Sequence, residues 1–223
     1  MESFNNDKQA AEYYIRASIN DAMNHFKDET LGTKIDLQLI SEPKREGADS
    51  YWSGIRAAAT GQDIDMFANY LVEKQSSLLN KATHVLFTGD NGDGVAGIAN
   101  LDTVCKPYNH PKDHTSGQYY EPSIAIVERN DNRPNDTIGW LVAHELGHNL
   151  GMQHSWAWED NFQYVPKGYC TRENTGGIGI MRNLQRNGRH TWNSCNRCDL
   201  LKSYQQYMLK YDKYCLLDLN SNN

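Results

Sequence analysis

Three histidines and one glutamate in a short stretch have the spacing of a hydrolytic metal site. On an α-helix, residues four apart share a face, so His144 and His148 can present nitrogens to one ion. Glu145 can then reach a water on that ion without being a ligand, which is where a general base belongs. Gly151 lets the chain turn out of the helix and bring in His154 as a third ligand. The pattern predicts a catalytic zinc site with one position left for water.

The alternative interpretation is a set of unrelated surface histidines, because a bare His-Glu-x-x-His occurs by accident in long proteins. The extended form found in residues 144–154 is much more specific, and it resembles the metzincin clan of zinc endopeptidases. That resemblance implies a turn downstream whose methionine floors the metal site, and Met181, at the end of the apolar run 176–181, fits it. Taken alone, Met181 would be interpreted as a core residue that fills a gap.

Length and composition fit one soluble enzyme domain: the chain has 223 residues, of which 39% are hydrophobic and 22% charged. The net charge of −6 and the lack of basic runs among aromatics argue against a nucleic-acid partner. No apolar stretch approaches about 18 residues, so no membrane segment is predicted. Residues 1–8 lack the apolar core of a signal peptide, so a secretion signal and a pro-segment are expected to lie outside this chain.

Five cysteines cannot all pair with one another, so two bridges and one further thiol are expected from Cys105, Cys170, Cys195, Cys198 and Cys215. The Cys-x-x-Cys pair formed by two of them would also suit half a zinc knuckle or a redox motif. No second such pair follows, which favours disulfide partners. Bridges, together with the glycosylation acceptor sequence at 135–137, indicate a secreted, extracellular protein.

Hydrophobic periodicity predicts helices that alternate with strands, which is typical of an α/β (α+β) fold. Helices are expected over 8–28, 64–79, 136–150 and 200–211, and strands over 34–40, 82–88, 95–101 and 122–128. The strand over 82–88 is expected to be buried. We expect a single domain over 1–223. It has an upper lobe (1–151) that carries the zinc-binding helix, and a small irregular lower lobe (152–223) that ends in a helix.

Within the metzincins the chain is most similar to the reprolysin or adamalysin group, which includes ADAM and venom metalloproteinases. Residues 14–40 match that group's first helix and following strand, and 87–105 match its third strand and its substrate-binding edge strand. The resemblance implies a twisted, mostly parallel sheet and a Cys105–Cys215 bridge. It also implies that Cys170 pairs with Cys195 or Cys198, and the sequence does not choose between them.

Three features depart from the reprolysin pattern. Ser155 stands where that group usually has aspartate and resembles the matrixins, and Gly179–Ile180 stand where a cysteine is common before the methionine. Only Met1–Asp7 precede the first helix, so the chain is expected to lack the family's first strand. Because the family's calcium site draws a ligand from that strand, bound calcium is not predicted.

The sequence therefore predicts a monomeric, secreted endopeptidase with one zinc ion, which hydrolyses peptide bonds in proteins. Glu145 would act as base and then as acid, and the substrate would pair with Val95–Leu101, as the resemblance implies. Two alternatives stay open. One is a matrixin-like matrix protease, which Ser155 favours, and the other is a catalytically weak secreted binding module that retains zinc.

Overall fold

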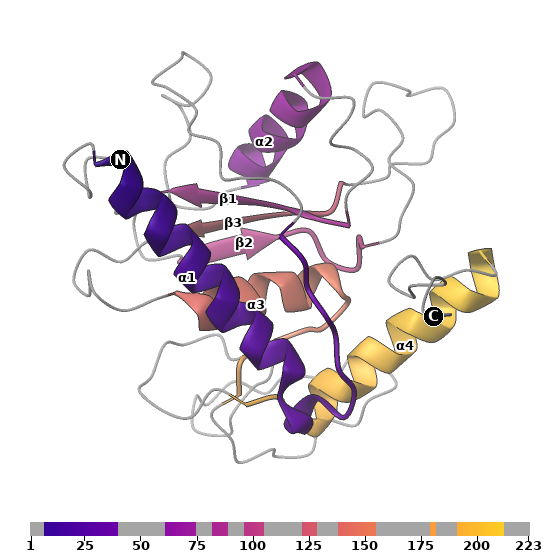
Figure 1. Cartoon of the computed structure of the whole chain (residues 1–223). Coiled ribbons are helices and arrows are strands. Elements are labelled where there is room, and N and C mark those ends of the chain that lie inside the picture. The colour runs from indigo at the N-terminus through magenta and orange to yellow at the C-terminus, as the bar shows by residue number, and fades with distance from the viewer. Residues whose placement is uncertain are drawn as a thin grey trace, which may run out of the picture.

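The structure is a computed structural model that describes residues 7–39, 61–74, 82–88, 96–104, 122–128, 138–154, 179–181 and 191–211. Its elements in chain order are α1 (Lys8–Lys27), the 3-10 helix η2 (Glu29–Leu31), α2 (Gly61–Lys74), β1 (His84–Thr88), β2 (Gly97–Ala99), β3 (Ile124–Glu128), α3 (Gly139–Asn149) and α4 (Ser194–Tyr211). Three strands form a sheet that lies between α2 and the pair α1 and α3, while α4 lies apart from the sheet (Figure 1).

The sheet is mixed, with the strand order β1-β3-β2. β1 pairs with β3 in parallel, and β2 pairs with β3 in antiparallel. All five residues of the central strand β3 are buried, and they divide between two cores because successive side chains point to opposite faces. Ile124 and Ile126 pack with α2, whereas Val127 belongs to the core around α3.

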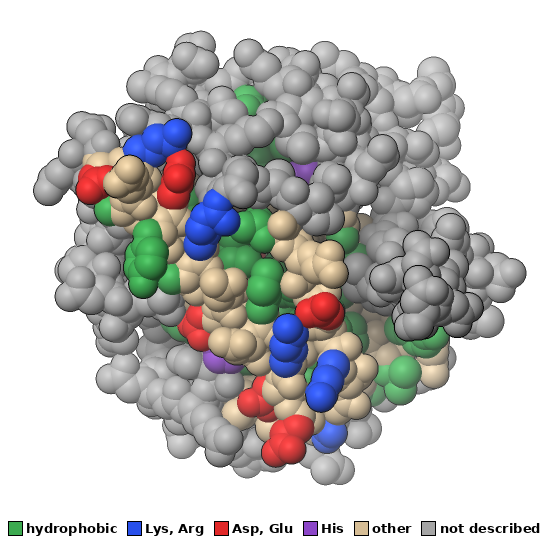
Figure 2. All heavy atoms as spheres, viewed as in Figure 1, with side chains coloured by type: hydrophobic (Ala, Val, Ile, Leu, Met, Phe, Trp, Pro, Cys, Tyr) green, Lys and Arg blue, Asp and Glu red, His purple; other side chains and the backbone are tan. Residues whose placement is uncertain are grey.

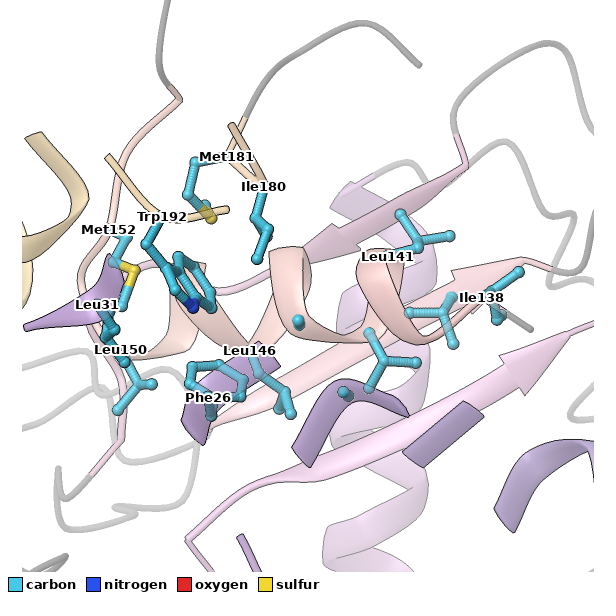
Figure 3. Close-up of a cluster of buried hydrophobic side chains, with 14 of the residues drawn as sticks. Phe26, Leu31, Ile138, Leu141, Leu146, Leu150, Met152, Ile180, Met181 and Trp192 are labelled. Carbon is cyan, nitrogen blue, oxygen red and sulfur yellow. The ribbon is translucent and has the colours of Figure 1, made fainter. Parts of the chain in front are cut away.

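The larger core surrounds α3 and joins segments that are distant in the sequence (Figure 3). Phe26 at the end of α1 packs against Trp192, with ring centroids 5.0 Å apart, and both belong to the same buried cluster as Leu146 of α3. The indole Nε1 of Trp192 donates a hydrogen bond to the carbonyl oxygen of His25 at 2.6 Å. Trp192 therefore fixes the segment before α4 onto the end of α1.

The outward face of α1 carries side chains of both charge signs (Figure 2). Lys8 pairs with Glu12 at 3.5 Å, and Lys27 pairs with Asp36 at 3.0 Å. These pairs are largely exposed to solvent, so each contributes little to stability. In the part of the chain that the structure describes, no helix is both long enough and apolar enough to cross a membrane.

The prediction of a strand over 34–40 is wrong for the residues that the structure describes. Residues 34–39 have no regular secondary structure, and the segment returns along α1 through a hydrogen bond from Ile35 N to Phe26 O at 3.2 Å. Ile35 and Leu37 pack against the core around α3. Their alternation with polar residues thus reflects packing on one side and not pairing in a sheet.

The remaining elements appear where the sequence predicts them, with shifted ends. The catalytic-motif helix, predicted over 136–150, is α3 (Gly139–Asn149), and α4 begins six residues before its predicted start at 200. The missed signal is Asn193, whose side-chain oxygen accepts from Asn196 N at 3.0 Å in the first turn.

The sheet differs from the prediction in two respects. The strand β1 is predicted to be buried, but its residues are only partly buried because it has a single neighbour among the described strands. The expected mostly parallel sheet has one parallel and one antiparallel pair in the described part.

Most of the cysteine predictions fall outside the described residues, which exclude Cys105, Cys170 and Cys215. Cys198 is disulfide-bonded, whereas Cys195 is a buried thiol, so the expectation that Cys195 could be the disulfide partner of Cys170 is wrong. The expected absence of the family's first strand concerns residues 1–7, of which the structure describes only Asp7. Asp7 is the N-cap of α1, and its side chain accepts a hydrogen bond from Ala10 N.

Candidate metal centre

The helix α3 carries the first half of the site and is buried along almost its whole length. His144, Glu145 and Asn149 are among its buried residues, although helices usually keep such polar groups at the surface. One side of α3 contacts α1 and the other contacts β2 and β3. At its start, the backbone N–H of Ile138 is bound by Ser18 Oγ of α1 at 3.3 Å. Packing on both sides therefore fixes the helix, and each polar side chain on it needs a partner or a purpose.

The chain reverses direction at Gly151, immediately after α3. Gly151 has φ +92°, a conformation that glycine adopts at little cost and other residues rarely adopt. The turn is closed by hydrogen bonds from Gly151 N to His148 O and from Met152 N to Gly147 O, each 2.9 Å long. The reversal brings His154 back to the helix face that carries the other two histidines.

The three histidines converge on one point. His154 Nε2 lies 3.1 Å from His144 Nε2 and 3.1 Å from His148 Nε2. One nitrogen from each ring lies within 4.8 Å of the others, and among the described residues this is the only group of three or more metal-ligating side chains so arranged. The structure thus brings together the three residues that the sequence predicts as metal ligands.

Backbone carbonyl groups orient two of the imidazoles. His144 Nδ1 lies 2.7 Å from Ile180 O, and His148 Nδ1 lies 2.8 Å from Met152 O. Because a carbonyl oxygen only accepts, each Nδ1 carries the hydrogen and each Nε2 keeps a bare lone pair. This arrangement, in which the outer nitrogen donates to a carbonyl, is the one that metal-binding histidines use to fix ring and tautomer.

Burial keeps these imidazoles neutral. It lowers the pKa of His144 to about 4, and His154 adds to the effect through charge repulsion. Burial likewise lowers the pKa of His148 to about 3, helped by the charges of His144 and His154. At neutral pH both rings are therefore in the form that binds a metal.

Met181 lies under the helix between the two ligands that α3 supplies. It is fully buried, and a Cβ placed on Gly147 would be only 2.6 Å from its sulfur. Gly147 is thus required for the close approach of α3 and the turn at Met181. A side chain at position 147 would displace Met181, which is packed on all sides. The neighbouring Ile180 supplies the carbonyl that orients His144. Residues 179–181 therefore pack against the histidine-bearing helix, and the Met-turn role of Met181 stays a prediction.

Glu145 is buried beside the strand β2. Its side chain is 3% exposed, and a Cβ placed on Gly97 would lie 2.6 Å from Glu145 Oε1. The other carboxylate oxygen, Oε2, has no hydrogen-bond partner among the described residues. Burial raises the pKa of Glu145 to about 8. A carboxyl group with one oxygen unpartnered among the described residues, held one residue from a ligand, is suited to exchange a proton with a bound molecule.

Two side chains of α4 contact segments beside the site: one holds the turned half, and the other holds the turn that follows β2. Asp199 Oδ2 accepts a hydrogen bond from Gln153 N at 3.0 Å, one residue before His154. One helical turn further on, Ser203 Oγ donates to Asp102 Oδ1 at 2.5 Å. Neither residue could be identified from the sequence, because both belong to no motif and act through long-range contacts. The acidic Asp199 within a helix that follows the motif was the only signal available.

The donor set fits a zinc ion. Two nitrogens that each lie about 2.0–2.1 Å from a tetrahedral ion are about 3.3 Å apart. The measured separations of 3.1 Å are close to that value. Three converging imidazoles, two of them neutral and oriented by backbone carbonyls, and no fourth protein ligand among the described residues, are typical of a catalytic zinc site and not of a structural one.

Comparison with known families identifies the chain. Residues 13–155, which contain most of α1, the three-stranded sheet and the whole histidine motif, match the reprolysin-like metallo-peptidase family M12B. The chain belongs to this family. It therefore has a metzincin α/β fold, and it is a zinc metalloendopeptidase domain in which the three-histidine group could hold the metal ion. The match favours the reprolysin interpretation over the matrixin-like alternative.

Individual relatives of this reprolysin-like domain are distant. It is 24% identical to the zinc metalloproteinase-disintegrin-like atragin of Naja atra over 174 residues, which cover 75% of this chain and 23% of the relative. It is 26% identical to a disintegrin and metalloproteinase with thrombospondin motifs 18 of Mus musculus over 216 residues, which cover 92% of this chain and 15% of the relative. The reprolysin-like domain thus spans less than a quarter of the length of either relative.

Proposed function

We propose that this protein cleaves peptide bonds within protein substrates at the three-histidine centre, with Glu145 as the general base and acid. The observation that carries the proposal is the unpartnered, buried Oε2 of Glu145, next in sequence to a buried histidine whose Nε2 is bare. Leaving a buried polar atom without a partner costs about 1–3 kcal/mol. A hydrogen bond from this atom to a bound reacting molecule would offset that cost.

A bound zinc would supply Lewis acidity and would lower the pKa of a water that it ligates toward about 7. His144, His148 and His154 would hold the ion, and the carbonyls of Ile180 and Met152 would keep two of the rings in position. Glu145 would accept the proton from the attacking water and return it to the leaving amine. Its pKa of about 8 without metal is lowered by a nearby cation, which leaves the group suited to both steps near neutral pH.

The substrate is proposed to lie extended along β2. Among the described strands, β2 is at the edge of the sheet in the order β1-β3-β2, so its outer side can pair with an added strand. Gly97 contributes no side chain at the point where β2 meets Glu145, which leaves the approach to the carboxylate open. A strand that binds peptide on both sides of the scissile bond favours cleavage within a chain over cleavage at its ends.

The broader features remain proposals. We propose a single domain with lobes 1–151 and 152–223, a monomeric state and secretion to an oxidising compartment. The disulfide in which Cys198 takes part supports such a compartment. The Cys105–Cys215 bridge, and a bridge from Cys170 to Cys198, are the pattern that we propose.

The decisive variant is Glu145→Gln, which keeps the shape of the side chain and removes its basicity. We expect one zinc per chain by elemental analysis, chelator-sensitive cleavage of casein by the wild type, and a loss of about 10²–10⁴-fold in kcat for the variant. Glu29→Gln, on the exposed 3-10 helix, is the matched control and should keep full activity. Retained turnover in zinc-loaded Glu145→Gln protein would refute the role of this residue. Zinc without cleavage in the wild type would favour the binding-module alternative.

A further inference from the structure

Asn149, the last residue of α3, joins three separate segments through its side-chain amide. It is 1% exposed. Its Nδ2 donates to Asn100 O at 2.8 Å and to Ile124 O at 3.0 Å, at the end of β2 and the start of β3. Its Oδ1 accepts from Thr83 Oγ1 at 2.8 Å, just before β1. One buried amide thus links the zinc-binding helix to all three strands of the sheet.

Both N–H donors of this amide are used. An asparagine amide has two N–H hydrogens, and the two backbone carbonyls take them. Thr103 Oγ1, at 3.4 Å from Nδ2, is a more distant neighbour. An aspartate has almost the same shape, but at this position it would place a carboxylate oxygen against two carbonyl oxygens. It could therefore not replace the two hydrogen bonds that Asn149 donates. The site requires a neutral group that donates twice.

The backbone after β2 is fixed to the same helix end. Asp102 N donates to His148 O at 2.8 Å, and Thr103 N donates to Asn149 O at 2.9 Å. Asp102 has φ +57°, a left-handed conformation that costs energy in residues other than glycine. These bonds, with the one from Ser203 Oγ to Asp102, hold the strained turn against the helix. The end of β2 is therefore attached to α3 both through backbone bonds and through the Asn149 side chain.

The position of β2 matters because the strand is short and lies directly against Glu145. It contains three residues, Gly97–Ala99, so its own ladder with β3 supplies few hydrogen bonds. A shift by one residue would turn every side chain to the opposite face and move Gly97 away from Glu145. A peptide paired with β2 would move with the strand.

We propose that Asn149 is a positioning residue: its buried amide holds the edge strand β2 in fixed register beside Glu145, and so places a paired peptide relative to the three histidines. The tether itself is a property of the fold. Its effect on substrate rests on the proposed function, in which the peptide pairs with β2.

Hydrogen exchange on zinc-loaded protein tests the tether without any substrate. The variants are Asn149→Ala, Asn149→Asp and the milder Thr83→Val, which removes the donor to Asn149 Oδ1 together with the longer contact from Thr83 Oγ1 to Ser123 O at 3.2 Å. Asn196→Ala is the matched control, because Asn196 is also a fully buried asparagine but accepts from Asn193 N at the start of α4. We expect the amide of Asn100, which donates to Ile124 O, to exchange about tenfold faster in Asn149→Ala, a factor equivalent to 1.4 kcal/mol. Thr83→Val should shift it in the same direction by less.

Kinetics then tests the consequence for substrate. A long peptide that can pair along β2 is compared with a short one that spans little more than the scissile bond. In Asn149→Ala, KM for the long peptide should rise about tenfold while kcat on the short peptide and the zinc content stay unchanged. Asn196→Ala should lose stability without altering either KM.

Several outcomes would overturn the inference. Unchanged exchange at Asn100 in both Asn149→Ala and Thr83→Val would refute the tether. An equal rise in KM for both peptides, or a loss of zinc, would show a general structural role in place of register control. If Asn149→Ala does not fold, Thr83→Val decides by the same two measurements. Absence of cleavage by wild-type protein would refute the proposed function alone, and exchange would still decide the tether.

Discussion

The two halves of the metal centre are built by different means. The helical half, with His144, Glu145 and His148, takes its geometry from the repeat of one α-helix that is buried on both sides. The turned half, from Gly151 to His154, has no repeating structure and is held by contacts with α4. The difference shows that a site of this kind needs one rigid element for most of its ligands, and needs long-range contacts only for the last ligand.

Removal of zinc should have the largest effect, because the ion joins the two halves. Free zinc at 1,000 times its Kd stabilises the folded state by about 4 kcal/mol. A chelator should therefore lower Tm by about 10 °C in a domain of this size, since 1 kcal/mol corresponds to about 2–4 °C. Thermal unfolding followed by circular dichroism, with and without chelator, measures the shift. An unchanged Tm in protein shown to contain zinc would contradict the view that the ion joins the halves.

Two alanine variants separate the halves in that experiment. His154→Ala without metal should unfold near the Tm of chelated wild type. His144→Ala should unfold lower, because it also leaves the carbonyl of Ile180 without its donor. Equal Tm values for the two variants would mean that His144 contributes no more to the stability of the metal-free domain than His154 does.

Overpacking the helical half should have the next largest effect. In Gly147→Val the new side chain would meet the sulfur of Met181, which is fully buried. We expect a loss of about 1–3 kcal/mol from the free energy of unfolding, measured with urea on metal-free protein. Gly147→Ala is the graded control, because the gain in helix propensity of about 1 kcal/mol offsets part of the clash. Wild-type stability in the valine variant would contradict the close contact.

The pH dependence of the metal-free domain should reveal the buried groups of the helical half. His144 and His148 have lowered pKa values of about 4 and 3, so the unfolded chain binds their protons more readily and stability falls as pH drops below 6.5. Glu145 has a pKa raised to about 8, so its protonated native form adds stability that is lost as pH rises from 4.5 through 8.

Stability of metal-free wild type should therefore be highest near pH 6.5 and should fall by about 2 kcal/mol toward pH 8. Urea titrations at a series of pH values measure this curve. Glu145→Gln should keep the acid limb and lose the alkaline fall. A fall of the same size in the variant would assign it to another group.

The smallest effect is expected in the turned half. Asp199→Ala removes the acceptor for Gln153 N and should weaken zinc binding about tenfold, as is usual for groups that orient a ligand. Competition with a chromophoric chelator measures the Kd. Ser203→Ala, one turn along the same helix, does not touch Gln153 and should leave the Kd unchanged. Equal weakening by both variants would point to a general loosening of α4.

What the sequence could predict follows the same division. Helical spacing was sufficient to place His144 and His148 together, and glycine at 151 was sufficient to predict the return of His154. The helices α1 and α3 and the central strand β3 were also predictable, because the spacing of their hydrophobic residues follows the period of the element itself.

The rest depended on contacts between distant segments. The alternating residues of 34–39 predicted a strand, yet they pack on one side of the helices without a strand partner in the described part of the chain. Likewise, nothing near Asn149 in the sequence shows that its amide will meet the ends of three strands. Long-range partners of this kind are set by the three-dimensional arrangement and have no local pattern.

The contacts of α4 have a consequence for the size of the cooperative unit. The family match ends at residue 155, and a chain ending there would still contain all three histidines. It would lack Ile180 O, which orients His144, and Asp199, which holds Gln153. Such a truncated chain would carry the full motif without being an autonomous metal-binding fold. Changes in sequence or length between Gln153 and α4 are therefore compatible with the site only if Ile180 O still contacts His144 and Asp199 still contacts Gln153.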